Sequence, residues 1–291
     1  MSGLVRKGVL KSIWSYRRAT WRSRSLPHFI VIGAQKAGTT SLFSYLAQHP
    51  HLFPSYRKEV HFFDGGLNPE VETYAFGRPW YQAHFPLRRQ LHASAKTFEA
   101  SPLYLFNPLT PRRIHKLLPD VKLIALLRNP AERTISHYFH EVRLGREARP
   151  IEQALTDQED QLDQVVLTQD YKSDYFVNKS YKSRSMYKQQ LDRYYEYFGK
   201  DQVLVLSSEN FFAEPTAALG RIYDFLGVDP DFRMLDLTPR NVATNRTRVD
   251  RGVYDYLSGF FEPHNHELFE LAGQKFDWND STSLRTAPSR H

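Results

Sequence analysis

The sequence of 291 residues contains no cysteine. Disulfide bonds, thiolate metal sites and a cysteine nucleophile are therefore excluded. A chain without cysteine suits a reducing compartment, so we expect a cytoplasmic protein. The 12 histidines show no spacing typical of metal ligands, so we also expect no metal ion.

Long apolar runs are missing as well. No segment approaches the roughly 18–20 apolar residues that are needed to cross a bilayer. The first residues also lack the apolar core, about 7–15 residues long, that characterises a secretory signal. We therefore expect neither a membrane span nor a cleaved signal sequence.

Acidic residues are absent from the first 25 positions, which contain seven Lys or Arg residues. These seven account for the whole net charge of +7, so the rest of the chain is formally neutral. Because a nucleic-acid-binding protein carries its basic face on the folded domain, we expect no nucleic-acid partner. Apolar residues recur at helical spacing among the bases, at Val5, Val9, Leu10, Ile13 and Trp14. Residues 1–26 thus predict a basic amphipathic extension that is solvated, docks on the protein or touches a membrane surface peripherally.

Apolar runs alternate with amphipathic segments from residue 27 to residue 291, which we interpret as a single domain. The predicted strands are residues 29–32, 96–99, 121–127 and 202–206. The predicted helices are residues 39–48, 108–118, 130–142, 184–198, 215–226, 251–261 and 265–272. Strands alternating with helices predict an α/β fold with a central parallel sheet and helices on both faces. Ligands of such folds bind at the carboxyl ends of the strands.

A glycine-rich loop joins the first predicted strand to the first helix. Gly33 and Gly38 have the G-x₄-G spacing of a phosphate-binding loop, and Lys36 stands between them. Glycines let backbone N–H groups approach an anion, and the following helix presents its positive end to the same anion. The predicted cofactor-binding residues of this P-loop-like strand–loop–helix are Lys36, Ala37, Gly38, Thr39, Thr40 and Ser41. The loop is not a Walker A motif, because its lysine does not follow the last glycine.

A second anion-binding residue follows the predicted strand 121–127. Arg128 stands at the carboxyl end of this strand, and its guanidinium fork suits a phosphate. Ser136, two turns into the next helix, can donate a hydrogen bond to the same group. A P-loop-type nucleotide kinase would instead need an aspartate near such a strand end to hold Mg²⁺. We keep this kinase and a non-catalytic nucleotide- or glycan-binding module as alternatives.

Together these residues resemble the motifs of the sulfotransferases that use 3′-phosphoadenosine 5′-phosphosulfate (PAPS). Residues 36–40 resemble the 5′-phosphosulfate loop of this family, and Arg128 and Ser136 resemble its 3′-phosphate motif. Residues 59–64 resemble the substrate-cleft motif of the heparan sulfate 3-O- and N-sulfotransferase branch. The resemblance implies that residues 27–291 are a sulfotransferase domain. This domain would move a sulfuryl group from PAPS to a hydroxyl or amine of an acceptor.

The resemblance also implies roles for individual residues. Glu59 would be the catalytic base with His61 beside it, and Lys36 would stabilise the leaving oxygen. We expect burial among aromatic neighbours to raise the pKa of Glu59. The residues predicted to contact the acceptor are Lys58, His61, Phe62, Ser101 and Tyr104. Since Ala100 stands where the 3-O-sulfotransferases carry a cleft lysine, the acceptor stays open between a carbohydrate and a small-molecule alcohol or secondary metabolite.

Overall fold

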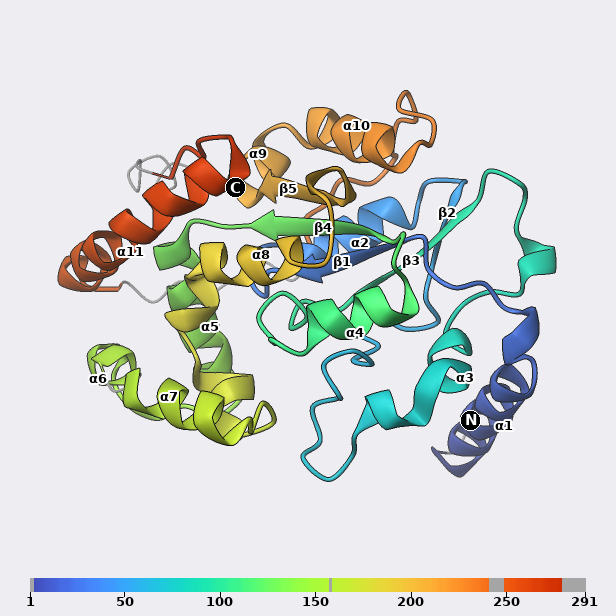
Figure 1. Cartoon of the computed structure of the whole chain (residues 1–291), viewed down its shortest axis with the longest axis horizontal. Helices are drawn as coiled ribbons and strands as arrows, with labels where there is room; N and C mark the ends of the chain where they lie inside the picture. The colour runs from blue at the N-terminus through green and yellow to red at the C-terminus, as the bar shows by residue number, and fades with distance from the viewer. Residues whose placement is uncertain (1–2, 157–158, 241–248, 279–291) are drawn as a thin grey trace.

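Five parallel strands form one central sheet (Figure 1). The computed structural model describes residues 3–156, 159–240 and 249–278. The strands are β1 (Phe29–Gly33), β2 (Leu52–Pro54), β3 (Lys96–Ala100), β4 (Lys122–Leu127) and β5 (Val203–Ser207). Their order across the sheet is β2-β3-β1-β4-β5. This arrangement confirms the predicted α/β fold with a central parallel sheet.

Strands β1 and β4 lie side by side at the centre of the sheet. Every residue of β1 is buried, and so is every residue of β4 after Lys122. Such continuous apolar runs are typical of parallel strands that are covered on both faces. After β1 the chain crosses to β2 and β3, and it returns on the other side with β4 and β5. The carboxyl ends of β1 and β4 therefore form the switch point at which α/β proteins bind ligands.

Helices cover both faces of the sheet, as predicted. The helices of the domain are α2 (Thr39–Leu46), α3 (Gly77–Gln82), α4 (Thr110–Leu117), α5 (Pro130–Arg143), α6 (Ile151–Thr156), α7 (Glu159–Thr168), α8 (Tyr187–Tyr195), α9 (Ser208–Ala213), α10 (Pro215–Leu226) and α11 (Arg251–Ala272). Figure 1 shows α4 and α8 on one side of the strands and α10 on the other. Helix α2 lies on the side of α9 and α10, since the rings of Tyr45 and Phe211 are 5.7 Å apart.

Two helix boundaries differ from the prediction. The expected helices 251–261 and 265–272 are one continuous helix, α11, with Pro263 inside it. Because Phe261 and Leu268 on either side of the proline both stay buried, packing outweighs the hydrogen bond that the proline removes. The expected helix 184–198 begins as a 3₁₀ turn and becomes α-helical only at Tyr187.

The N-terminal extension forms a helix, α1 (Gly3–Ala19), that docks beside α3. The Trp14 ring lies 4.7 Å from that of His84. Arg17 donates from Nε to the carbonyl oxygen of Ala83 (2.8 Å) and from Nη2 to that of Phe85 (2.9 Å). Part of the basic charge of the extension is therefore used in holding the helix to the domain. None of the helices in the described ranges has the length and apolar character that a membrane span requires.

Candidate active site

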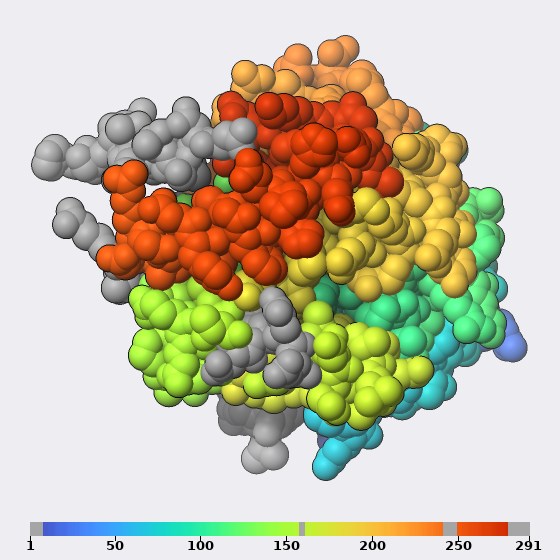
Figure 2. Space-filling model, turned by 60° about the vertical axis from the view of Figure 1, so that its left-hand side comes forward, coloured from blue at the N-terminus to red at the C-terminus, as the bar shows by residue number. Residues whose placement is uncertain are grey.

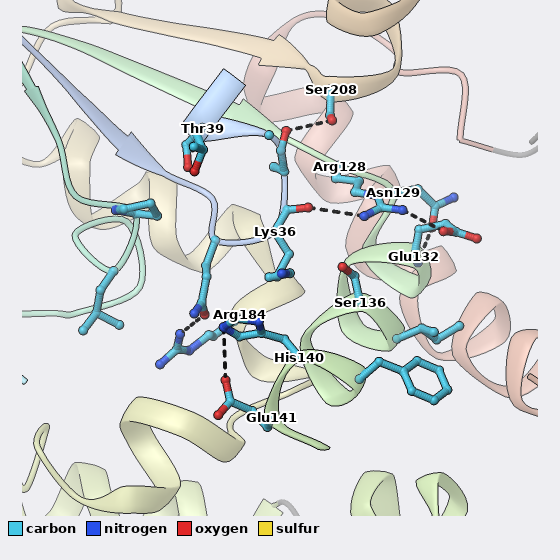
Figure 3. A pocket seen from close by; sticks show the side chains of 18 of the residues that line it. Lys36, Thr39, Arg128, Asn129, Glu132, Ser136, His140, Glu141, Arg184 and Ser208 are labelled. Carbon is cyan, nitrogen blue, oxygen red and sulfur yellow. Dashed lines mark hydrogen bonds and ion pairs between the residues drawn. The ribbon is translucent and has the colours of Figure 1, made fainter. Parts of the chain in front are cut away.

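A cavity of about 1180 Å³ opens at the carboxyl ends of β1 and β4. The predicted residues that line it are Lys36, Ala37, Gly38, Thr39, Thr40, Glu59, His61, Arg128 and Ser136. They come from the loop before α2 and the start of that helix, the loop after β2, the residue after β4, and the first half of α5. Figure 3 shows Lys36, Thr39, Arg128 and Ser136 around the same space. Both predicted anion-binding segments and the predicted base therefore face one cavity.

The loop before α2 has the backbone of an anion cradle. Lys36 (φ 71°) and Gly38 (φ 97°) both lie in the left-handed region. This φ of Gly38 is strained for any other residue, and a Cβ atom there would also lie 2.6 Å from the ring of Phe212, so the position favours glycine. The N–H groups of Lys36 and Gly38 donate to no other described group, and those of the first turn of α2 have no partner within the helix. These groups are available to a bound anion.

The ammonium group of Lys36 points into the cavity (Figure 3). It makes no hydrogen bond or ion pair with any described residue. Burial and, after it, the nearby cations Arg143 and Arg128 lower the pKa of Lys36 to about 8. A desolvated cation without a counter-ion is costly, and a bound anion would remove that cost.

Arg128 joins the two anion-binding segments. Its Nη1 donates to the carbonyl oxygen of Lys36 (3.3 Å), and its Nη2 forms an ion pair with Glu132 (2.8 Å). The Arg128 carbonyl accepts a hydrogen bond from the hydroxyl of Tyr187 (2.9 Å). The hydroxyl of Ser136 has no hydrogen bond to a described residue. Arg128 thus forms a salt bridge and still lines the cavity.

Glu59, His61 and Asp64 form a charged row at the edge of the cavity. His61 Nδ1 lies 2.6 Å from Asp64 Oδ2, and His61 Nε2 lies 3.5 Å from Glu59 Oε2. Lys58 forms a short ion pair with the other oxygen of Glu59. Both Glu59 (φ 62°) and His61 (φ 52°) have left-handed backbone conformations, which the side chains of these residues disfavour.

The raised pKa that we expected for Glu59 is wrong for this state of the site. Burial alone would raise it, but His61 and Lys58 stabilise the carboxylate and lower its pKa to about 2. Burial alone would lower the pKa of His61, because it disfavours the charged imidazolium, but Asp64 and Glu59 raise this pKa to about 9. At neutral pH the row therefore contains an ionised Glu59 beside a protonated His61.

Three predicted acceptor contacts are buried below the cavity and do not line it. The exposed fractions of Phe62, Ser101 and Tyr104 are 1%, 0% and 0%. The predicted donor contact Ser41 is buried too, and its hydroxyl accepts a hydrogen bond from the N–H of Arg240 (2.8 Å). Lys58 lines a smaller adjoining hollow of about 300 Å³, which Glu59 and His61 share. Only Lys58 and His61 of the five predicted acceptor residues can therefore meet an acceptor directly.

Four residues of the site were missed by sequence reasoning. Asp64 was readable, because it stands three residues after His61 within the same motif. Glu132 and His140 also line the cavity from the helix that begins just after Arg128. Arg184 lines it from far along the chain and donates to the side chain of Gln35, and no local pattern identified it. The late stretch 241–248, where the family's adenosine loop would fall, lies outside the described residues.

The charged row predicts a pH effect that can be measured without substrate. The raised pKa of His61 stabilises the fold below about pH 6.5, and this stabilisation is lost as the pH rises through about 9. We expect Asp64→Asn to move the titration of His61, followed by NMR, down towards 6.5 and to flatten the fall in unfolding free energy over this range. The matched surface change Asp192→Asn should alter neither. An unchanged His61 titration in Asp64→Asn would show that Asp64 is not the cause of the raised pKa of His61.

Comparison with known proteins also indicates a sulfotransferase, along most of the chain. The family model described as a sulfotransferase domain matches residues 26–282. The chain is 29% identical to heparan sulfate glucosamine 3-O-sulfotransferase 6 of Mus musculus, over 88% of this chain and 75% of that protein. It is 26% identical to the membrane-associated sulfotransferase kil1 of Dictyostelium discoideum, over 88% of this chain and 67% of that protein.

A solved structure agrees in fold as well as in sequence. The sulfotransferase from Alicyclobacillus acidocaldarius superposes with a TM-score of 0.71 at 29% identity, covering 87% of this chain and 99% of that one. Sulfuryl transfer is thus favoured over the nucleotide kinase and the non-catalytic module. The chain belongs to the sulfotransferase family and is an enzyme.

Proposed function

We propose that this sulfotransferase uses PAPS as its donor. The loop around Lys36 binds the 5′-phosphosulfate, and Arg128 with Ser136 binds the 3′-phosphate. The observation that carries this proposal is that both anion-binding segments face one cavity, with the Arg128 guanidinium 3.3 Å from the Lys36 carbonyl oxygen. When the donor binds, its 3′-phosphate would replace Glu132 as the partner of Arg128.

Glu59 is the proposed base and Lys36 the proposed electrophilic group. The acceptor hydroxyl attacks sulfur as Glu59 takes its proton. The bond between sulfur and the bridging phosphate oxygen breaks at the same time, and 3′-phosphoadenosine 5′-phosphate leaves. Lys36 donates a hydrogen bond to the bridging oxygen as charge grows on it. The protonated His61, fixed by Asp64, orients Glu59 and is an acceptor contact as well.

The proposed acceptor is a hydroxyl or amine of a carbohydrate. This rests on the relatives whose names specify heparan sulfate glucosamine. A panel that contains heparan sulfate, neutral oligosaccharides and small-molecule alcohols, incubated with labelled PAPS, separates the carbohydrate from the other acceptors. Transfer only to non-carbohydrate alcohols would overturn this part of the proposal.

The donor site predicts a loss of affinity in two variants. Lys36→Ala and Arg128→Ala should each weaken binding of 3′-phosphoadenosine 5′-phosphate by roughly tenfold to a hundredfold, because each removes a charged hydrogen bond to the ligand. Isothermal titration calorimetry measures this. Lys188→Ala and Arg221→Ala remove the same kinds of charge from α8 and α10 and should bind as the wild type does. Wild-type affinity in both site variants would reject the donor site.

The base predicts a split between binding and turnover. Glu59→Gln keeps the size of the side chain but cannot take a proton, so we expect the turnover number to fall by about 10²–10⁴-fold. Donor affinity should stay within about twofold, since Glu59 makes no donor contact in the proposed arrangement. Retained turnover in Glu59→Gln would reject the role of this residue as the base.

We also propose that residues 1–26 are an extension that places the domain of residues 27–291 at an anionic membrane surface. Acidic residues are absent from residues 1–25 and from residues 73–98, which include α3, against which α1 docks. Exposed apolar side chains of α1 are Val9, Leu10, Ile13 and Tyr16. A helix that combines such side chains with basic residues suits an anionic lipid surface better than a nucleic acid.

The cavity stays accessible in this arrangement. Figure 1 shows α1 and α11 at opposite ends of the molecule. Figure 2 looks onto α11, and there the blue residues near the N-terminus are visible only at the margin. Since α11 lies against α5, which lines the cavity, this wall of the cavity lies away from a membrane that binds α1.

Vesicle flotation tests the membrane proposal. The chain should float with vesicles of phosphatidylcholine and phosphatidylserine but not with phosphatidylcholine alone. The double change Lys11→Glu and Arg18→Glu should weaken binding by roughly tenfold or more. The charge reversal Arg221→Glu on α10 is the control and should bind normally. Equal flotation of all three proteins, or binding to nucleic acid in place of vesicles, would contradict the proposal.

A further inference from the structure

A carboxyl group without a cationic partner lies directly below the loop that carries Glu59 and His61. Glu99, near the end of β3, has an exposed fraction of 0%. None of the described Lys, Arg or His side chains forms an ion pair with it. Its Oε1 accepts hydrogen bonds from the hydroxyls of Tyr81 (2.6 Å) and Tyr104 (3.3 Å), and its Oε2 accepts one from Ser101 (2.8 Å). Burying a carboxyl group in this way is unfavourable, so its retention calls for a reason.

Two of these three hydroxyls also hold the backbone of the loop. The hydroxyl oxygen of Ser101 accepts a hydrogen bond from the N–H of His61 (3.3 Å). That of Tyr104 accepts from the N–H groups of Phe62 (2.9 Å) and Phe63 (3.4 Å). The hydroxyls thus connect three consecutive backbone amides to one carboxyl group.

The direction of these hydrogen bonds is fixed by chemistry. A backbone N–H can only donate, so the hydroxyl oxygens of Ser101 and Tyr104 must accept from it. Their hydrogens then need an acceptor, and an ionised carboxylate is acceptor-only. An amide or a protonated acid at position 99 must itself donate a hydrogen bond. An amide presents its NH₂ either to Ser101 or to Tyr104 and Tyr81, so one of the two hydroxyls that hold the loop loses its acceptor. A protonated acid removes the acceptor from the hydroxyl that its proton meets.

The loop needs this support, because Glu59 and His61 both have left-handed backbone conformations. Such conformations persist only where the surroundings over-determine them. Two further hydrogen bonds hold the loop. The N–H of Glu59 donates to the carbonyl oxygen of Ala100 (2.9 Å), and the hydroxyl of Thr73 donates to the carbonyl oxygen of His61. The contacts through Ser101 and Tyr104 hold the loop from below, on the side away from the cavity.

We propose that Glu99 is a positioning residue of the sulfotransferase reaction: through the hydroxyls of Ser101 and Tyr104, its carboxylate holds residues 61–63 so that Glu59 and His61 face the cavity. The inference rests on the proposed role of Glu59 as the base. Tyr81 provides a comparison, since its hydroxyl donates to the same carboxylate but makes no hydrogen bond to the loop.

The ionisation of Glu99 gives the arrangement a pH dependence. Burial raises the pKa of Glu99 to about 7, although hydrogen bonds from Tyr81 and Ser101 oppose the rise. Among the loop residues that face it, Asp64 raises this pKa and His61 lowers it. Since the loop needs the ionised form, turnover should increase as the pH rises through about 7. Glu59 (about 2) and His61 (about 9) do not titrate in this range. Lys36 (about 8) loses its proton just above it, and that loss would lower turnover, not raise it.

The kinetic test compares variants around this one carboxylate. Glu99→Gln should lower the turnover number by roughly tenfold to a hundredfold at pH 8 and abolish the increase near pH 7, because the base is misplaced. Affinity for 3′-phosphoadenosine 5′-phosphate should stay within about twofold. Ser101→Ala and Tyr104→Phe should also lower the turnover number. Tyr81→Phe is the matched control: it should only move the increase to higher pH and should reach wild-type turnover on the plateau above it.

Amide hydrogen exchange tests the same inference without any acceptor. In Glu99→Gln the amides of residues 61–63 should exchange at least about tenfold faster, while those of β4 stay protected as in the wild type. Wild-type turnover and exchange in Glu99→Gln, or an equal loss of turnover on the plateau in Tyr81→Phe, would overturn the inference. If the wild type transferred no sulfuryl group but the exchange changed as expected, the proposed function would fail and the support of the loop by Glu99 would stand.

Discussion

The hydrogen bond from the Arg128 guanidinium to the carbonyl oxygen of Lys36 joins the loops that follow β4 and β1. It is possible only because the two strands are parallel neighbours that end at the same edge of the sheet. One loop offers backbone N–H groups and an ammonium, and the other offers a guanidinium. The distance between the two loops is therefore set by the sheet and not by the flexible side chains. A ligand with two separated anionic groups meets a site whose spacing exists before it arrives.

Backbone strain coincides with the proposed chemistry. Among the described residues, the non-glycine residues with positive φ are Lys36, Glu59, His61 and Gln169, and the first three line the cavity. Left-handed conformations of such residues cost about 1–3 kcal/mol each, and only a rigid surrounding maintains them. For the loop of Glu59 and His61 that surrounding includes the buried hydroxyls of Ser101 and Tyr104, which accept hydrogen bonds from its backbone. The orientation of these two side chains thus depends on tertiary contacts.

A feature of the fold or the site could be predicted from the sequence when the residues that form it are close together in the chain. The loop around Lys36 and the position of Arg128 were readable, because both depend on a strand, a short turn and a helix that are contiguous in the chain. The orientation of Phe62 was not, because side chains alternate regularly only along an extended strand, and the left-handed residues Glu59 and His61 break the alternation. Arg184 reaches the cavity from far along the chain, so only the folded structure could identify it.

The electrostatics of the cavity give a physical reason why an anion would bind there. Burial and neighbouring cations lower the pKa of Lys36 to about 8 and that of His140 to about 4. The pKa of His61 is raised instead, because Asp64 and Glu59 lie against it. The Lys36 ammonium in the centre of the cavity thus has no ion-pair partner among the described residues, and His140 is neutral at pH 7, while the charges at the edge are paired. A donor that brings phosphate and sulfate oxygens to the centre supplies the missing partner there and leaves the paired row free to meet the acceptor.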